Sequence, residues 1–227
     1  MRLGNRLQTI TSKIPKGLTV VDVGTDHAYL PIYLINKGIS KKVIATEILP
    51  GPYRKAQKNI KKAGLQDLID LRLGPGFKTI SPAEGDIAVV AGMGAMTIIS
   101  IINESRQVAD SFEKLILQPM KNPAELRKYL FTIGYKIIDE DVTREDDKFY
   151  EIIVVKKANL SLFDETDIMV GPVIRNKKNP VIIEYINYRI NILQGIIKDL
   201  KVTDTKACQK AVLKYEKLLK TLEEVIK

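Results

Sequence analysis

Two aspartates flank a single glycine in the segment DVGTDHAY, residues 22–29, at the end of the β-branched run 19–23. A dinucleotide-binding turn would instead carry three glycines, so that backbone amides can approach a pyrophosphate closely. The carboxylates of Asp22 and Asp26 would repel a pyrophosphate and attract a cation. Gly24, Thr25 and His27 complete the turn around them. The segment therefore favours a ligand with an ammonium and a sulfonium, S-adenosylmethionine, over NAD.

Further candidate ligand contacts stand where other predicted strands end. Glu47 can accept hydrogen bonds from both hydroxyls of a ribose. NAD-binding proteins share such an acid, and an acid there also stabilises the N-terminus of a following helix. Glycines after the third and fourth strands would allow close approach to an adenine and to a flat base, although turns and helix packing need glycine as well. These loops consist of Gly74, Pro75 and Gly76, and of Ala91, Gly92, Met93 and Gly94.

The elements that position these residues alternate between strands and helices. Apolar runs predict strands at 19–23, 43–46, 68–73, 86–91 and 114–117, and helical spacing predicts helices at 28–37, 50–63, 95–108 and 122–133. Such alternation predicts a parallel sheet with helices on both faces. A ligand of such a sheet lies across the carboxyl ends of its strands, where the candidate residues stand.

The alternation stops after Gly134. Residues 135–142 and 149–155 are predicted to be two strands joined by the acidic turn 143–148, with no helix between them. Crossovers followed by a hairpin are typical of the Rossmann-like class I methyltransferase sheet, whose last strand is antiparallel. We therefore predict an α/β fold with a mostly parallel sheet of this kind.

Residues 158–227 have a different pattern. Residues 158–179 are predicted to be a connector with a short helix, and apolar residues then recur every three or four positions over 182–200 and 208–226. The short link between these segments predicts an antiparallel, coiled-coil-like helical hairpin, with Thr203 or Asp204 capping the second helix. The sequence thus predicts two domains, residues 1–157 and 158–227.

The composition narrows the class of protein. The chain has 36 Lys and Arg against 27 Asp and Glu, a net charge of +9, which favours a polyanionic partner such as nucleic acid. A lysine-rich genome would produce the same excess. A single cysteine and a single histidine argue against a disulfide framework and against a metal site. No apolar run is long enough to span a membrane, and no secretory signal precedes the first strand, so we expect a cytoplasmic protein.

The motifs together resemble the bacterial tRNA (adenine(22)-N1)-methyltransferases. The resemblance extends from about Arg6 to the C-terminal hairpin. It rests on DVGTDHAYLP at 22–31, on Glu47 with Gly51 and Pro52, on AGMG at 91–94, on LQP at 117–119 and on VGP at 170–172. It implies a Rossmann-like S-adenosylmethionine domain followed by a small helical domain, which we expect to bind tRNA.

The resemblance also implies the reaction, a methyl transfer to N1 of adenine. Positive charge then builds on the base, and a carboxylate near the base would stabilise this charge and later accept a proton. Asp26 is the first candidate for this role. His27 and Tyr29 are expected to orient the base by hydrogen bonding or stacking, and Gln118, beside Pro119, to read its edge. A structural histidine and a buried tyrosine are the alternatives.

A basic cluster on the predicted helix 50–63 is expected to contact tRNA phosphates, although a solvated helix face is the simpler alternative. Its members are Arg54, Lys55, Lys58, Lys61 and Lys62. We expect a monomer that uses no metal. A methyltransferase acting on a small molecule or protein, with the hairpin as a dimerisation element, is the main alternative. A catalytically silent RNA-binding protein and an NAD oxidoreductase are the others.

Overall fold

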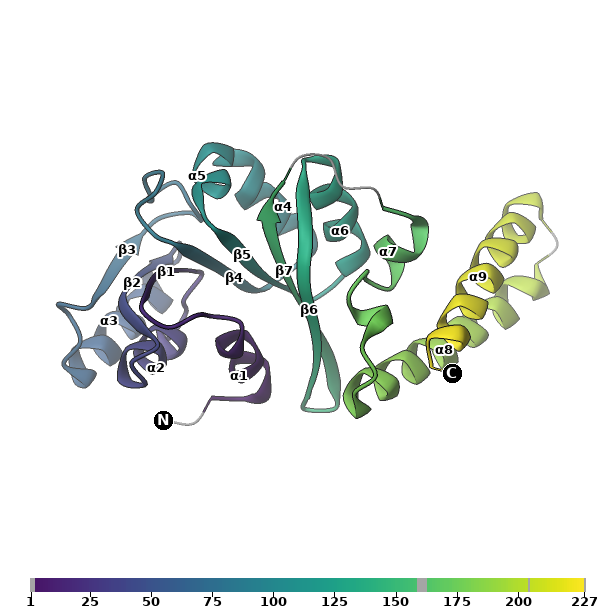
Figure 1. Cartoon of the computed structure of the whole chain (residues 1–227), viewed down its shortest axis with the longest axis horizontal. Helices are drawn as coiled ribbons and strands as arrows, with labels where there is room; N and C mark the ends of the chain where they lie inside the picture. The colour runs from purple at the N-terminus through teal and green to yellow at the C-terminus, as the bar shows by residue number, and fades with distance from the viewer. Residues whose placement is uncertain (1–2, 159–162, 204, 227) are drawn as a thin grey trace. The chain divides into compact units, whose positions relative to one another are not determined.

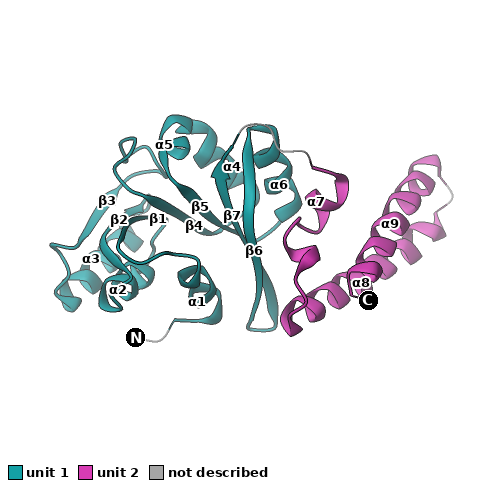
Figure 2. Ribbon diagram, viewed as in Figure 1, with its two compact units in different colours: residues 1–161 teal, residues 162–227 magenta. Residues whose placement is uncertain are grey.

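The computed structural model describes residues 3–158, 163–203 and 205–226. The chain divides into two compact units, residues 1–161 and residues 162–227 (Figure 2). The predicted boundary after residue 157 falls at the end of the last strand. Binding of tRNA by the second unit stays a prediction. Asp204, one of the two residues expected to cap the last helix, lies outside the described residues.

The first unit alternates strands with helices and ends in a β-hairpin (Figure 1). Its strands are β1 (Leu18–Val23), β2 (Ser40–Glu47), β3 (Ile69–Leu73), β4 (Ile87–Met93), β5 (Lys114–Pro119), β6 (Tyr135–Glu145) and β7 (Lys148–Lys157). Its helices are α1 (Asn5–Ser12), α2 (Tyr29–Asn36), α3 (Pro50–Ala63), α4 (Ala95–Glu104), α5 (Arg106–Ser111) and α6 (Pro123–Thr132).

The described strands form one seven-stranded sheet with the order β3-β2-β1-β4-β5-β7-β6. Neighbouring strands from β3 to β5 are parallel, whereas β7 lies antiparallel between β5 and β6. This order confirms the predicted fold class. The chain crosses outward in both directions from β1, so the strand order reverses between β1 and β4, where sheets of this kind bind their ligands.

Helices bury the centre of the sheet on both faces. Helices α1, α2 and α3 cover one face, and α4, α5 and α6 cover the other (Figure 1). Val20 and Val21 of β1 and Val89 and Val90 of β4 have no exposed surface. Successive side chains of a strand point to opposite faces, so both are buried only when both faces are covered. This double burial explains the continuous apolar runs of the sequence.

Helix α3 begins and ends at the predicted residues. It starts with Pro50, whose fixed φ suits the first helical turn. It ends before Gly64, whose φ of 67° is the left-handed conformation that commonly terminates a helix. Lys61 and Lys62 lie in its last turn, where positive charge interacts favourably with the helix dipole. The predicted bounds 50–63 are confirmed.

Two local expectations for the first unit are wrong. The single helix expected at 95–108 is divided into α4 and α5, because Ser105 leaves the helical region with φ −136°. The turn expected at 143–148 is shorter, since the strands reach Glu145 and Lys148. Asp146 and Asp147 both have positive φ, as two-residue hairpin turns of type I′ require.

Helix α1 has no counterpart among the expected elements and is held by β6. The Arg6 N–H in its first turn donates to Glu145 Oε2 at 2.9 Å. At the other end, Lys13 Nζ lies 2.8 Å from both Asp139 Oδ2 and Asp141 Oδ2. The two ends of α1 are therefore fixed along one strand of the hairpin.

A buried ion cluster joins α6 to the two strands of the hairpin. Arg127 Nε donates to Glu140 Oε1 at 2.7 Å, and Arg127 Nη2 donates to Glu151 Oε2. The side chains of Arg127 and Glu140 have no exposed surface, and Glu151 is nearly as buried. Burial of these charges is tolerated only because they are paired.

The second unit contains the predicted antiparallel helical hairpin (Figure 1). Its elements are α7 (Glu165–Met169), the 3₁₀ turn η1 (Ile174–Asn176), α8 (Pro180–Val202) and α9 (Lys206–Val225). Ile186, Ile190 and Leu193 of the predicted seam are buried. Thr205 caps α9 by accepting the Cys208 N–H at 3.2 Å, so the expectation of Thr203 is wrong. Among the described helices, none is both long and apolar enough to cross a membrane.

Candidate active site

A cavity of about 260 Å³ opens at the carboxyl ends of β1 and β4. It brings together the first loop and part of the fourth, as the sequence predicts, and adds two residues of α1. Sites for drug-sized ligands measure about 300–1,000 Å³, so this cavity would enclose part of such a ligand. The cavity is lined by Arg6, Leu7, Asp22, Gly24, Thr25, Asp26, His27, Tyr29, Leu30, Ala91 and Gly92.

Gly24 is the point at which the chain turns away from β1. Its φ of 74° lies in a region that glycine adopts without strain. Its N–H donates to the Thr46 carbonyl of β2 at 2.9 Å, and a Cβ at this position would overlap the side chain of Met93. The glycine therefore permits both a left-handed turn and a close approach between the ends of β1 and β4.

Glu47 is buried, and both of its carboxylate oxygens accept backbone hydrogen bonds. Oε2 accepts the Asp26 N–H at 3.1 Å, and Oε1 accepts the Leu49 N–H at 2.9 Å. Glu47 thus ties the loop after β1 to the residue that precedes α3. Each carboxylate oxygen has a second lone pair, so these bonds are compatible with the predicted contact to a ribose.

Two residues of the first loop other than glycine have left-handed backbone. Asp26 has φ 52° and Ala28 has φ 59°, on either side of His27. A residue held in such a region costs about 1–3 kcal/mol, and such residues cluster at functional sites. Asn59 of α3 stabilises the conformation, because its Nδ2 donates to the His27 carbonyl at 2.9 Å. These two left-handed residues make the loop a candidate functional element.

His27 and Tyr29 form an aromatic pair in the cavity wall. Their rings are stacked, with 5.2 Å between centroids and an interplanar angle of 21°. His27 Nε2 lies 3.5 Å from Asp26 Oδ2. Tyr29 is 46% exposed, which contradicts the alternative of a buried tyrosine. The pair offers a flat aromatic surface to a ligand.

Asp22 lies in the cavity wall with only 5% of its surface exposed. The pKa of Asp22 is raised from 3.8 to about 6. Burial is the main cause, the Thr25 side chain opposes the rise, and the charge of Glu47 adds to it. Above that pH the buried carboxylate is ionised at a cost, since burial disfavours the charged form. A cationic ligand in the cavity would relieve this cost.

We expect Asp22→Asn to stabilise the protein at neutral pH. The folded state binds the Asp22 proton more tightly than the unfolded chain, so stability falls as pH rises from 3.8 and reaches its lower plateau above about 6. The shift in pKa corresponds to a loss of about 3 kcal/mol in the free energy of unfolding above pH 6. The asparagine amide is uncharged but still polar, so the variant should recover about 2 kcal/mol of this loss. Urea unfolding at pH 4.5 and pH 7.5 measures the difference.

The matched control for this prediction is Asp146→Asn in the exposed hairpin turn, whose left-handed conformation asparagine also adopts. This variant should leave the free energy of unfolding nearly unchanged at both pH values. If Asp22→Asn increased the free energy of unfolding by the same amount at pH 4.5 and pH 7.5, the raised pKa of Asp22 would be contradicted.

The loop after β3 lines a separate cavity. Pro75 and Gly76 contribute to a space of about 170 Å³ that Ile101 of α4 also lines. Gly74 packs against Thr79, whose side chain a Cβ at residue 74 would overlap. The structure does not bring these loop residues into the cavity beside β1, and their contact with an adenine stays a prediction.

Gln118 at the end of β5 is fully buried, and its amide is bonded within the protein. Its Oε1 accepts from Arg6 Nη1 at 2.9 Å and from the Gly92 N–H at 3.1 Å. Its Nε2 donates to the carbonyl of Pro119, which is itself buried, at 2.9 Å. Gln118 therefore supports Arg6, and this geometry does not match the expectation that it faces a substrate base.

Arg6 and Leu7 reach the cavity from α1, and no predicted motif includes them. The feature of the sequence that could have predicted α1 is the spacing of Leu7, Ile10 and Ile14, which places apolar side chains on one face of a helix. Ile10 and Ile14 are buried in the same core cluster as Val20 of β1. A helix of 8 residues depends on such contacts, because short isolated helices are marginal in water.

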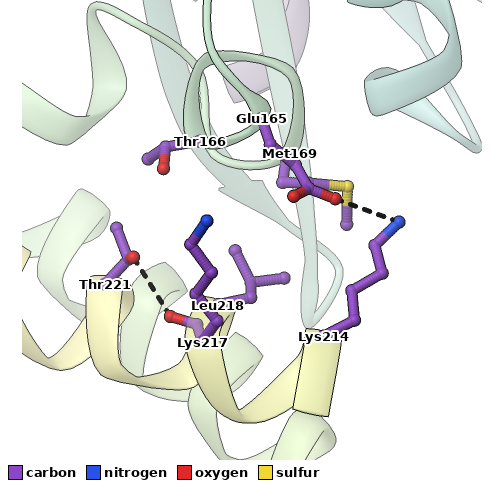
Figure 3. Close-up of a pocket in the computed structure, with 7 residues that line it drawn as sticks. All are labelled: Glu165, Thr166, Met169, Lys214, Lys217, Leu218 and Thr221. Atoms are coloured by element: carbon purple, nitrogen blue, oxygen red, sulfur yellow. Dashed lines mark hydrogen bonds and ion pairs between the residues drawn. The ribbon is translucent and has the colours of Figure 1, made fainter. Parts of the chain in front are cut away.

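The second unit contains a much smaller cavity of about 20 Å³ between α7 and α9 (Figure 3). Lys214 Nζ and Glu165 Oε1 form an ion pair of 3.2 Å at its edge. A space of this size holds about one water molecule. The cavity beside β1 is lined by the predicted residues of the first loop at the switch in strand order, and it is therefore the candidate active site.

The strand order and the acidic wall of this cavity define the class of protein. A sheet that ends in an inserted antiparallel strand, with buried Asp22 beside the switch in strand order, characterises a Rossmann-like S-adenosylmethionine-dependent methyltransferase. Within that class, the chain belongs to the tRNA (adenine(22)-N(1))-methyltransferase family, whose model matches residues 20–227.

Individual relatives agree with the family assignment. The chain is 32% identical over 232 residues to the tRNA (adenine(22)-N(1))-methyltransferase of Bacillus subtilis strain 168, covering 100% of this chain and 98% of the relative. The structure of Streptococcus pneumoniae Sp1610 in complex with S-adenosyl-L-methionine matches with a TM-score of 0.87, 30% identity and 100% coverage of both chains. The structure of M. capricolum TrmK with S-adenosyl-homocysteine matches with a TM-score of 0.82, 26% identity and 100% coverage of both chains.

Proposed function

We propose that this chain transfers a methyl group from S-adenosyl-L-methionine to N1 of adenine at position 22 of tRNA. The observation that carries the proposal is the acidic cavity beside β1, whose wall holds Asp22 and Asp26. The family assignment supports the substrate and the position that is methylated.

The residues around the cavity fit a cationic cofactor. When bound, S-adenosylmethionine supplies a methyl group on a positively charged sulfur. The carboxylates of Asp22 and Asp26 attract positive charge, and burial of Asp22 strengthens this attraction. The further cofactor contacts that we propose are Gly24, Thr25 and His27 in the turn, Glu47 for the ribose, Gly74, Pro75 and Gly76 for the adenine, and Ala91, Gly92, Met93 and Gly94 beside the methyl group.

Asp26 is the residue that we propose acts on the base. Its side chain is 63% exposed, so it can meet a substrate that enters from solvent. Neutral adenine has a lone pair on N1 and needs no strong base before the transfer. The Asp26 carboxylate would stabilise the positive charge that develops on the base and would then accept a proton. The stacked rings of His27 and Tyr29 would orient the base.

Helix α3 and β3 border a wide groove that fits an RNA backbone. The groove has a volume of about 650 Å³ and is lined by Arg54, Lys58 and Lys61, with Tyr53 beside them. All five basic residues of the predicted cluster, which also includes Lys55 and Lys62, are exposed. Proteins recognise folded RNA largely through shape and phosphate contacts, and this groove provides the cations for such contacts.

Replacing Lys58, Lys61 and Lys62 together with alanine should weaken tRNA binding and reduce its dependence on salt. Each lost phosphate contact lowers the slope of log K against log salt by about 1. Fluorescence titrations at four salt concentrations measure this slope. The matched control replaces Lys37, which follows α2, and Lys41 and Lys42 at the amino end of β2, all of which are exposed. Equal slopes for both triple variants would contradict the proposed RNA surface.

A direct test of the function is incubation with unmodified tRNA and labelled cofactor. Nucleoside mass spectrometry then identifies the methylated atom, and a map of reverse-transcription stops identifies the nucleotide. We expect 1-methyladenosine at position 22. Methylation in the absence of RNA would contradict the proposal in favour of a methyltransferase that acts on a small molecule or protein. Absence of methylation together with absence of S-adenosylhomocysteine binding would contradict it in favour of a catalytically silent RNA-binding protein.

We also propose that the protein acts as a cytoplasmic monomer without a metal, and that residues 162–227 contribute to tRNA binding. The basic residues of α9 support the last point, since lysines are exposed along its length. Light scattering with and without tRNA measures the oligomeric state.

A further inference from the structure

We propose that the groove between α3 and β3 binds an unpaired nucleotide of tRNA other than the target adenine, and that the base of this nucleotide stacks on Tyr53. The inference deepens the proposed function, because it rests on tRNA as the substrate. It adds recognition of a base to a groove that the proposed function uses only for phosphate contacts. Among the residues that the structure describes, none lines both this groove and the candidate active site.

Tyr53 is a half-buried aromatic residue in the first turn of α3. Its backbone N–H donates to the Leu49 carbonyl at 3.0 Å, which fixes the residue within the helix. Its side chain lines the groove and makes no hydrogen bond or ring contact within the described part of the chain. The ring is therefore available to stack on a flat ligand in the groove.

Apolar side chains lie beneath the groove beside Tyr53. Ile60 and Ile69 are buried, and Leu71 is half-buried. A surface that only held phosphates would need cations and no such apolar base. Proteins that bind single-stranded nucleic acid instead combine a positively charged groove with aromatic side chains on which bases stack.

The charged residues that line the groove are all basic. Arg54, Lys58 and Lys61 follow one another at spacings of four and three, so they project from one face of α3. No acidic residue lines the groove in the part of the chain that the structure describes. The groove therefore complements a polyanion, and the family to which the chain belongs acts on tRNA.

The aromatic ring favours an unpaired nucleotide over a paired stem. The bases of a stem stack on one another inside the duplex, so a stem offers phosphates to the cations but no base face to Tyr53. An unpaired base can turn outward, stack on an aromatic ring and form hydrogen bonds along its edge. The exposed amides of Gln57 and Gln66 supply donors and acceptors for such an edge.

An acidic segment of a partner protein is the other occupant that the charges allow. Such a segment would pair with β3 as a further strand, since β3 lies at the edge of the sheet. The edge is only 5 residues long, and the Ile69 N–H already donates to the Leu65 carbonyl at 2.9 Å. A short edge with one donor already used is a poor template for a peptide strand, so the groove favours RNA.

Fluorescence titration with unmodified tRNA at four salt concentrations tests the proposal. Tyr53→Ala should weaken binding about tenfold at every salt concentration, as expected for the loss of one stacked base. Stacking releases no counterions, so the slope of log K against log salt should equal that of the wild type. This parallel shift distinguishes Tyr53 from the lysines of α3, whose replacement should reduce the slope.

Three further variants separate stacking from effects on folding. Tyr53→Phe keeps the ring and should bind tRNA within about twofold of the wild type, whereas Tyr53→Leu keeps apolar volume and should lose as much affinity as Tyr53→Ala. Tyr33→Leu is the matched control and should bind tRNA as the wild type does. Tyr33 is also half-buried on a helix, α2, but it does not line the groove.

Steady-state methylation and a second pair of probes complete the test. Tyr53→Leu should raise KM for tRNA about tenfold and leave kcat and the Kd of S-adenosylhomocysteine within about twofold, because it removes binding that is equal in the ground state and the transition state. A short single-stranded oligoadenylate should bind Tyr53→Leu about tenfold more weakly than the wild type. An RNA duplex of the same length should bind both proteins equally.

Wild-type affinity of Tyr53→Leu for tRNA would overturn the inference and leave the proposed function intact. Equal losses for the duplex and the oligoadenylate would overturn it in favour of a paired stem. A glutamate-rich peptide whose affinity depends on Tyr53, while that of the oligoadenylate does not, would overturn it in favour of a protein partner. Binding of tRNA that depends on Tyr53, without methylation at position 22, would support the inference and overturn the proposed reaction.

Discussion

Asp26→Asn will lower kcat for tRNA methylation about 100-fold, in line with the contribution of a positioned acid or base, and leave the Kd of S-adenosylhomocysteine within a few-fold. The Asp26 side chain is largely exposed, whereas the buried Asp22 remains to attract the cofactor. The variant therefore removes charge stabilisation of the methylated base more than cofactor binding. Single-turnover kinetics with unmodified tRNA measures the chemical step.

Asparagine is the informative replacement because the backbone at residue 26 is left-handed, with φ 52°. Asparagine adopts this conformation as readily as aspartate does, so Asp26→Asn changes the charge and preserves the loop. Asp26→Ala should lower kcat at least tenfold as well, with an added loss from backbone strain. An unchanged single-turnover rate for Asp26→Asn excludes the carboxylate from the reaction.

Arg127→Met will destabilise the protein by about 3–5 kcal/mol, because it removes the buried positive charge that pairs with the carboxylates of Glu140 and Glu151. Arg127 and Glu140 have no exposed side-chain surface, and Glu151 is nearly as buried. The three residues join α6, β6 and β7, so the loss affects the half of the sheet that holds α1. Urea unfolding at pH 7.5 measures the change in the free energy of unfolding.

The matched control for Arg127→Met is Arg144→Met on the same hairpin. Arg144 pairs with Asp147 at the surface, where both side chains are largely exposed, and such pairs contribute about 0–1 kcal/mol. Replacing the whole buried cluster, Arg127→Met with Glu140→Leu and Glu151→Leu, should restore most of the lost stability. Equal losses for Arg127→Met and Arg144→Met would contradict the importance of the buried cluster.

Local signals were sufficient for most of the sheet and for helices with clear ends. Helix α3 begins with Pro50 and ends before Gly64, and both residues act through their own backbone preferences. The strands are apolar on both faces because helices cover both faces of the folded sheet. Such features depend on the residues of one segment and can be predicted from that segment alone.

The parts that could not be predicted depend on contacts between distant segments. The left-handed Ala28 is stabilised by its surroundings, including the bond from Asn59 of α3 to the His27 carbonyl. Gln118 was expected to read the edge of the substrate base, but it is fully buried and accepts a hydrogen bond from Arg6 of the distant helix α1. The role of the aspartates in the first loop could be predicted from the sequence, because their charge indicates a cationic ligand. The position of Arg6 beside them could be seen only in the folded structure.

The contact between Arg6 and Glu145 spans 139 positions of the chain, and this separation has a consequence for synthesis on the ribosome. The five parallel strands can begin to pair as they emerge, since domains fold progressively from the N-terminus during translation. The wall of the cavity formed by α1 lacks its hydrogen bond and ion pairs with β6 until the hairpin has left the exit tunnel. A nascent chain arrested before that point should therefore lack affinity for the methyl donor, even though its glycine turn has already been made.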